Sequence, residues 1–254
     1  MNIGGRPPQI TSADIERAGR AIGLRRLSLN AVAQELGVTA TALYRHVENR
    51  MGLERLVGES ILAELELLDD PALDDKHHLL AQGLRLYEFT LAHPGLASYM
   101  QTLFPRGEGG RRLLADATRA LHRRGYDPAV AMVLSSAVAI LAIGYAAAAD
   151  ERRVRADVIE QELEVVTVDN LADEGIGQVL RVLPQVEDAE YVRLWLGAAI
   201  NGFLQAAQPG QGVTDLLHLM RADVARPHDD PASVPPGPSS RPEDTSTPGL
   251  SELS

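Results

Sequence analysis

The spacing of apolar residues along the chain is helical almost throughout. Apolar side chains recur every three or four positions, and β-branched residues cluster only over the short run Val165–Val168. The sequence therefore predicts an all-α protein whose helices are separated by Gly and Pro. Glu151–Glu187 is more charged and predicts one or two weaker helices, with a loop near Glu174–Gly177. The stronger predicted helices are Ser12–Leu24, Ser28–Leu36, Thr39–His46, Arg50–Leu68, Lys76–Ala92, Leu96–Leu103, Arg111–Arg124, Pro128–Asp150 and Asp188–Ala206. A short additional helix stays open at Leu216–Ala225.

The longest apolar stretch, Ala129–Ala149, is close to the roughly 20 residues that a membrane-spanning helix needs. Alanine is only weakly lipophilic, however, and Ser135 and Ser136 interrupt the stretch. We therefore expect a buried or interface helix, capped by Asp127, and no membrane association. The N-terminus lacks the charged start and apolar run of a signal peptide, and the chain holds no cysteine, so a cytoplasmic location is expected.

Charge is distributed unevenly along the chain. Residues 1–57 contain eight arginines and five acidic residues, which gives this part a charge of +3. Because the whole chain carries −11, the remainder carries −14. Such a chain has a small basic head on a large acidic body, as expected where only the head meets phosphate groups.

Two short helices that meet at Gly37 give the strongest indication of function. The small Ala33 lets the two helices approach closely, and Gly37 allows the turn a backbone conformation that costs other residues more. The side chains expected to face outward are short polar groups, an aromatic donor and a long cation, which suit the major groove of DNA. The flanking pattern favours DNA binding over a purely structural helix-turn-helix. The apolar residues expected to hold these helices on the first one are Leu29, Val32, Leu36, Val38, Leu43, Ile15, Ala18 and Ile22.

The head resembles the DNA-binding domain of the TetR family. The resemblance covers Leu27–Leu56 and is carried by Leu-Tyr-Arg-His-Val at 43–47, followed by Glu-Asn-Arg at 48–50. A weaker resemblance to the tetracycline-repressor-like branch extends over residues 76–207. In that family, the third helix enters the major groove, a dimer spans a two-fold operator, and an effector bound in the body moves the heads apart.

The resemblance implies a set of DNA-contacting positions. Three of them depart from the tetracycline repressors, which have a base-reading arginine at the position of Asn30, Gln-Pro at Ala40-Thr41, and tryptophan at Arg45. We therefore expect a different operator, because Asn30 suits adenine and Arg45 suits guanine or phosphate. The predicted DNA-binding residues are Ser28, Asn30, Thr39, Ala40, Thr41, Tyr44, Arg45, His46 and Arg50. Tyr44 could instead pack against the first helix, and His46 could act as a helix-end cap.

The predicted organisation follows from these features. Residues 1–50 form the three-helix DNA-binding head, residues 51–70 the connecting helix, and residues 71–225 the effector-binding and dimerisation body. Residues 226–254 are rich in Pro, Ser, Asp and Thr and should form a disordered tail. Small residues on the last strong helix, from Gly197 to Gly202, suit the close helix contacts of a homodimer.

An effector pocket is expected among the helices at 76–149. Its candidate lining residues are Tyr87, His93, Tyr99, Met100, Phe104 and Met132. The tetracycline repressors place a magnesium-binding histidine near His93 and an acid near Ala148, where this chain has only alanine. Magnesium–tetracycline is therefore not expected as the effector, a helix-stop role suits His93 better, and no metal or other cofactor is predicted.

The predicted function is that of a dimeric repressor, not an enzyme, that binds a palindromic DNA operator and releases it when a small molecule binds. Two alternatives stay open at this point. The chain could be a ligand-independent regulator or an activator, or a helical ligand carrier or enzyme with a vestigial head. The sequence shows no nucleophile–base pair, metal cluster or phosphate-binding loop that would support catalysis.

Overall fold

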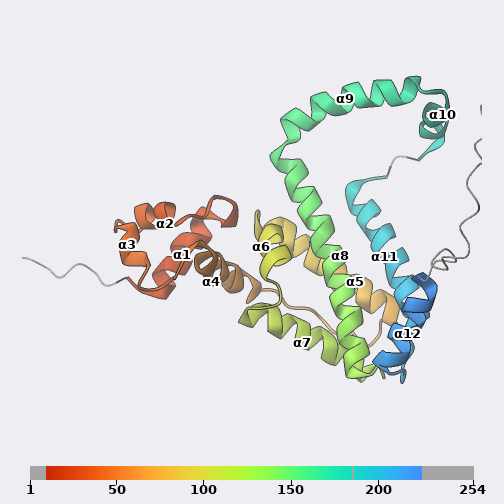
Figure 1. The fold of residues 1–254 in the computed structure, drawn as a ribbon, viewed down its shortest axis with the longest axis horizontal. Helices are drawn as coiled ribbons and strands as arrows, with labels where there is room; N and C mark the ends of the chain where they lie inside the picture. Colours follow the sequence, from red (N-terminus) through yellow and green to blue (C-terminus); the bar gives the residue numbers. More distant parts are fainter. Residues whose placement is uncertain (1–9, 185, 225–254) are drawn as a thin grey trace, which may run out of the picture.

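The structure, a computed structural model, describes residues 10–184 and 186–224. All regular structure in these parts is helical, which confirms the predicted all-α fold. Figure 1 shows a small group of helices at one end and a larger group at the other, with α4 between them. The predicted tail, 226–254, lies outside the described residues.

In the head, α1 packs on α4, and α2 packs on α1 and α3. Thr11 caps the first helix in a capping box with Asp14, so the chain enters the head at a defined angle. α1 and α4 approach closely because position 19 is glycine. A Cβ atom on Gly19 would overlap the Cγ2 atom of Val57. The elements of this part are α1 (Ser12–Ile22), the 3₁₀ turn η1 (Leu24–Arg26), α2 (Leu29–Glu35), α3 (Ala40–Leu43) and α4 (Arg50–Leu62).

The body is built around the long helix α8, which packs against α5, α6, α7 and α11. Asp127 caps α8 as predicted, because its side chain accepts hydrogen bonds from the backbone N–H groups of Ala129 (2.9 Å) and Val130 (3.3 Å). The helices of the body are α5 (Asp75–Ala92), α6 (Leu96–Leu103), α7 (Glu108–Arg123), α8 (Pro128–Val154), α11 (Asp188–Ala206) and α12 (Val213–Val224).

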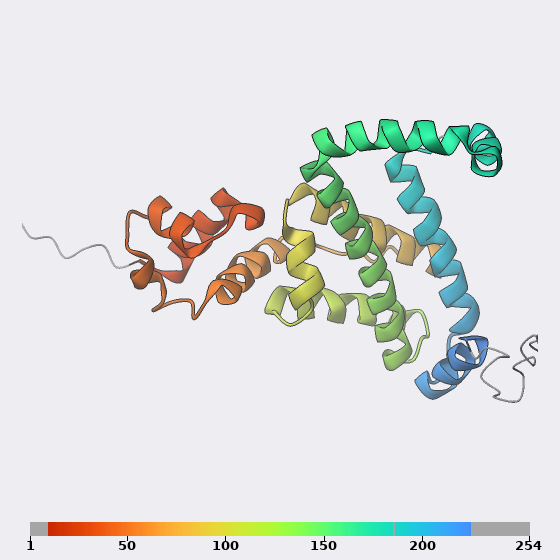
Figure 2. The ribbon, with the colours of Figure 1, turned by 45° about the horizontal axis from the view of Figure 1, so that its top comes forward.

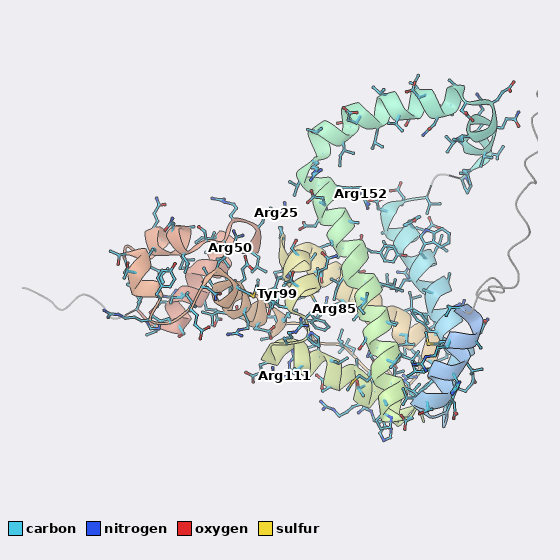
Figure 3. All side chains as sticks on the ribbon, in the orientation of Figure 1. Arg25, Arg50, Arg85, Tyr99, Arg111 and Arg152 are labelled. Atoms are coloured by element: carbon cyan, nitrogen blue, oxygen red, sulfur yellow. The ribbon has the colours of Figure 1, made fainter. Side chains whose placement is uncertain are left out.

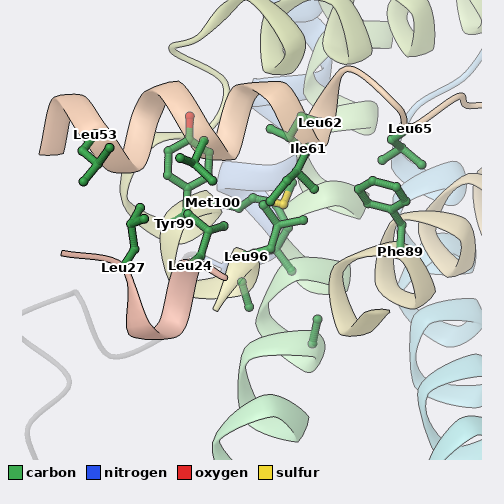
Figure 4. Packing of buried hydrophobic residues seen from close by; sticks show 14 of the residues in the cluster. Leu24, Leu27, Leu53, Ile61, Leu62, Leu65, Phe89, Leu96, Tyr99 and Met100 are labelled. Carbon is green, nitrogen blue, oxygen red and sulfur yellow. The ribbon is translucent and has the colours of Figure 1, made fainter. Parts of the chain in front are cut away.

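One hydrophobic cluster runs from the head into the body. Leu27 of the head, Leu53 and Ile61 of α4, and Tyr99 and Met100 of α6 all belong to it (Figure 4). Because burial of apolar surface is the main stabilising term in folding, the head is held against the body by packing and is more than a tethered domain.

Two helices stand away from the body. α9 (Ala156–Ala172) leaves the end of α8 and leads to α10 (Glu174–Val182), and both views show this pair extending beyond the packed helices (Figures 1 and 2). The predicted loop at Glu174–Gly177 is wrong, because α10 begins there. Asp173 caps the helix by accepting hydrogen bonds from the backbone N–H groups of Gly175 and Ile176.

α1, α3 and α4 are shorter than their sequence pattern predicts. α1 ends at Ile22 instead of Leu24, which lies in η1. The regular part of α3 ends at Leu43, and hydrogen-bonded turns carry the chain on to His46. α4 ends at Leu62 instead of Leu68, because Arg112 of α7 takes up its last carbonyl oxygens and Leu65 turns into the core.

In the described part of the chain, α8 is the only helix long and apolar enough to cross a membrane. One side of it, however, packs against α5, α6, α7 and α11, whereas Ile140 on the outer side is exposed. The packing thus agrees with a core role for part of this apolar stretch.

Candidate nucleic-acid interface

The turn between α2 and α3 has the geometry that the sequence suggested. Ser28 caps α2, since its Oγ atom accepts a hydrogen bond from the backbone N–H of Ala31 (3.1 Å). Gly37 has a φ angle of +64°, in the left-handed region that favours glycine. The backbone N–H of Val38 donates to the carbonyl oxygen of Ala33 at 2.9 Å and closes the turn. α3 is therefore presented at a fixed angle to α2.

The apolar faces of α2 and α3 are buried against α1. Ile15, Val32 and Leu43 are fully buried, and Val47 closes the cluster where the chain leaves α3. Burial of these side chains fixes which face of α3 points to solvent.

Most of the predicted contact residues are exposed on the helix-turn-helix or next to it. Tyr44 is 55% exposed, so it does not pack mainly against α1, and Arg45 beside it is also exposed. Ser28 and Ala40 are half-buried, because one caps α2 and the other packs on the core cluster. The remaining members of the predicted set are exposed: Asn30, Thr39, Thr41, His46 and Arg50.

Two members of the predicted set border clefts between the head and the body. Arg50 lines a cleft of about 370 Å³ together with Arg25 and Asp150, and its Nε atom pairs with Glu54 at 2.8 Å. His46 borders a second cleft of about 450 Å³ beside α7. The structure thus places Arg50 and His46 at clefts that adjoin the body.

Ion pairs within the chain leave only part of the positive charge of the head uncompensated. Four arginines of the head form ion pairs with acidic residues: Arg17–Asp14, Arg20–Glu64, Arg25–Asp150 and Arg50–Glu54. Among residues 10–184 and 186–224, Arg26, Arg45 and Arg55 of the head have no ion-pair partner. All three are exposed, and Arg45 lies beside Tyr44 at the end of the helix-turn-helix.

The nearly buried Asp150 joins the head to two helices of the body. Its carboxylate lies 2.5 Å from the guanidinium of Arg25 in the head and accepts the backbone N–H of Gly95, at the start of α6, at 3.0 Å. Gly95 leaves room for this contact, because a Cβ atom there would lie 2.5 Å from the backbone nitrogen of Arg25. Arg25 lies on the side of the head that faces the body (Figure 3).

The body contains a large open groove and a small cavity. The groove, about 1070 Å³, lies between α5, α8, α9 and α11 and is lined by Tyr87, Leu91 and Ile159 among others. The cavity, about 30 Å³, lies between α5, α7 and α8. Gln82 and Ser135 line it, and the Oγ atom of Ser135 is buried without a hydrogen-bond partner.

No family model and no curated protein matches the sequence. Solved structures, in contrast, match most of the chain. ActR from Streptomyces coelicolor in complex with actinorhodin, described as a TetR family protein, is 20% identical, with a TM-score of 0.66 over 80% of this chain and 99% of ActR. The chain has the TetR-family fold.

Two further structures with the TetR-family fold cover similar shares of the chain. The transcriptional regulator SCO7222 from Streptomyces coelicolor is 19% identical, with a TM-score of 0.60 over 78% of this chain and all of its own. A single-residue variant of TetR from Acinetobacter baumannii, in complex with minocycline, is 20% identical, with a TM-score of 0.55 over 78% of this chain and 96% of its own.

Within this TetR-family fold, the six residues predicted to bind an effector do not converge. Tyr87 lines the groove and Phe104 lines the small cavity, whereas Met100 is buried in the core. Met132 lies on the surface of α8 and is 48% exposed. The Nδ1 atom of His93 lies 2.8 Å from the carbonyl oxygen of Phe89, one turn earlier in α5, where the helix stops.

Tyr99 lies at the junction of head and body (Figure 3). Its hydroxyl group donates a hydrogen bond to the carboxylate of Glu59, and burial together with this bond raises the pKa of Tyr99 above its usual value. The phenol therefore stays protonated and serves as a donor between α6 and α4.

Sequence reasoning missed the residues that join distant elements. Glu59, Asp150, Gln82 and Ser135 are polar residues on mainly apolar helices. Their number is small enough that a search for polar positions on the inward faces would have found them. Their partners, however, are distant in sequence: Tyr99 lies 40 positions from Glu59, and Gly95 lies 55 positions from Asp150. No local pattern therefore predicts these pairs.

We expect Asp150→Ala to lower the free energy of unfolding by about 2–3 kcal/mol, because it leaves the Arg25 guanidinium and the Gly95 N–H without their partner. Urea denaturation followed by circular dichroism measures this change. Glu151→Ala is the matched control, since Glu151 is exposed and forms only a surface pair with Arg155. Equal stability of the two variants would contradict the role given to Asp150.

Proposed function

We propose that the chain is a homodimeric DNA-binding transcription regulator, and specifically a repressor that a small-molecule effector releases from its operator. The observation that carries this proposal is the exposed set Thr39, Thr41, Tyr44 and Arg45, which extends from the N-cap of α3 to the turn after it in a helix-turn-helix. These are hydrogen-bonding and cationic groups, and the acidic body leaves the head as the basic part of the chain.

Dimerisation is proposed through the outer faces of α8 and α11. Both helices expose large apolar side chains, with Ile140 69% and Leu194 55% exposed, and Trp195 lies beside Leu194. Gly144 and Gly202 have open space where a Cβ atom would be, so packing within the chain does not require them to be glycine. A second copy, packed closely against both helices, accounts for the apolar exposure and for the glycines together.

The effector is proposed to bind in the groove between α5, α8, α9 and α11. Its volume of about 1070 Å³ is sufficient for an organic molecule of several rings, and its walls are mainly apolar. Solved structures of the same fold hold actinorhodin and minocycline, which supports a small-molecule ligand here. The proposal includes that the protein is soluble and binds DNA in the cytoplasm.

Selection of binding sequences from random DNA, followed by footprinting on the DNA upstream of its own gene, tests the proposal. We expect a palindromic site whose affinity falls about 1,000-fold between 50 and 200 mM salt, because a dimer that contacts about six phosphates releases a similar number of counterions. Recovery of no preferred sequence, or an affinity that is independent of salt, would contradict DNA binding by the arginine-rich head.

A further inference from the structure

Glu59 of α4 caps the beginning of α7. Its carboxylate accepts the backbone N–H of Gly110 at 3.2 Å and the hydroxyl of Tyr99. The N-cap residue of α7, Gly107, has no side chain of its own, and a Cβ atom there would overlap the Cδ atom of Glu59. The carboxylate thus occupies the place of an N-cap side chain, where the helix dipole favours negative charge.

Arg112 of α7 caps the end of α4 in return. Its Nη2 atom donates to the carbonyl oxygens of Leu62 (3.1 Å), Ala63 (3.3 Å) and Leu65 (2.9 Å). Leu62 is the last residue of α4, and its carbonyl oxygen also accepts the backbone N–H of Leu65 at 3.2 Å in the turn that follows. Carbonyl groups at the end of a helix have no partner in the next turn of the helix, so a side-chain donor stabilises them. A cation at this end is also favoured by the helix dipole.

Each of the two helices therefore supplies the cap that the other lacks. Glu59, Tyr99 and Arg112, with these contacts, form the α4–α7 clasp. A rotation of α4 relative to α7 would break hydrogen bonds at both ends of the clasp at once. α4 and the N-terminal half of α7 are consequently expected to move as one unit.

α7 is also in contact with the interior of the body. Leu113, Leu114 and Ala117 line the small cavity with Ser135 of α8, whose hydroxyl has no hydrogen-bond partner. Any change in the packing around this cavity acts on α7 directly. The clasp then passes the displacement to α4, which carries the head.

We infer that Glu59 and Arg112 are positioning residues for DNA binding: the clasp fixes the angle of α4 and so the distance between the two heads of a dimer. This inference rests on the proposed function. The two α3 helices of a dimer must match two half-sites about one turn of DNA apart, so a change in the angle of α4 alters the fit to both half-sites without altering either contact surface.

The test compares a half-site with a full site, both taken from sequences selected by the purified protein. Arg112→Met removes the donors but keeps the aliphatic stem. We expect its affinity for the half-site to stay within about twofold of the unchanged protein and its affinity for the full site to fall about tenfold, with weaker discrimination against spacers one base pair longer or shorter. Arg112→Lys, which keeps a cationic donor, should restore most of the loss.

Arg119→Met is the matched control, because Arg119 lies two turns further along α7 and pairs only with Asp116 on the surface. It should bind both DNA fragments like the unchanged protein. Equal losses on half-site and full site, or no loss on either, would overturn the inference. Glu59→Gln, which keeps the shape but loses the charge, provides a second variant from the other side of the clasp.

A distance measurement separates failure of the clasp from failure of DNA binding. The chain has no cysteine, so spin labels on Gln34→Cys and Ala81→Cys report the distance from head to body without competing sites. We expect Arg112→Met to broaden the distance distribution and Arg119→Met to leave it unchanged. An unchanged distribution in Arg112→Met would overturn the clasp even if the protein binds DNA as proposed. Absence of any DNA binding, with a broadened distribution, would overturn the proposed function alone.

Discussion

Replacing both Tyr44 and Arg45 by alanine is expected to weaken binding to a selected DNA site at least 100-fold. The two side chains are exposed neighbours at the end of α3, and each contact with a base or phosphate contributes about 1–3 kcal/mol in each head of a dimer. Because both side chains are exposed, their truncation should leave the free energy of unfolding nearly unchanged. Fluorescence anisotropy with labelled DNA measures the affinity.

The control for this variant is Arg119→Ala, which removes one exposed arginine from the body. It should bind DNA like the unchanged protein, since the body is not expected to meet the phosphates. If the Tyr44 and Arg45 variants kept full affinity, the helix-turn-helix would be a structural element and the proposal of a DNA-binding regulator would fail.

Introducing glutamate at both Ile140 and Leu194 is expected to convert the dimer into a monomer. In the proposed interface these side chains are buried against the partner, and two unpaired carboxylates there would cost several kcal/mol. The dissociation constant of the dimer should rise by at least about 1,000-fold, and affinity for the palindromic site should fall with it because one head alone reads one half-site. Sedimentation velocity measures the oligomeric state.

Leu68→Glu is the matched control, because Leu68 is 77% exposed but lies between α4 and α5, away from α8 and α11. This variant should remain dimeric. A double variant at Ile140 and Leu194 that also stays dimeric would place the interface elsewhere.

Helices with clear end signals could be predicted from the sequence to the residue. α6 and α11 have the predicted bounds, and α8 begins at Pro128 behind its cap Asp127. The one or two weaker helices predicted within Glu151–Glu187 are α9 and α10. The first turn of α10 was predicted as a loop because of Gly175 and Gly177, although Asp173 supplies an N-cap that outweighs them. The end of α4 could not be predicted, because the residue that terminates it, Arg112, lies about 50 positions away.

The exposed residues of the helix-turn-helix could be predicted from the local sequence pattern alone, since α2, α3 and their turn are short and adjacent in sequence. The clefts that Arg50 and His46 border could not be predicted in this way, because they depend on how the head packs on the body. The six predicted effector residues scatter for the same reason. Each lies on an apolar stretch, but which face of each helix meets a groove is decided by packing among the helices of the body.

The contact of Asp150 with Arg25 and Gly95 has a consequence for how the sequence can change. Three positions that are far apart along the chain behave as one unit, so a mutation at any one of them alone leaves a defect at the other two. A side chain at position 95 would collide with the backbone of Arg25 and would be strained at a φ angle of +88°. Loss of the charge of Arg25 or of Asp150 would leave the other without its ion-pair partner. Variation at these positions in related sequences is therefore expected to be concerted, even where the DNA-facing residues diverge freely.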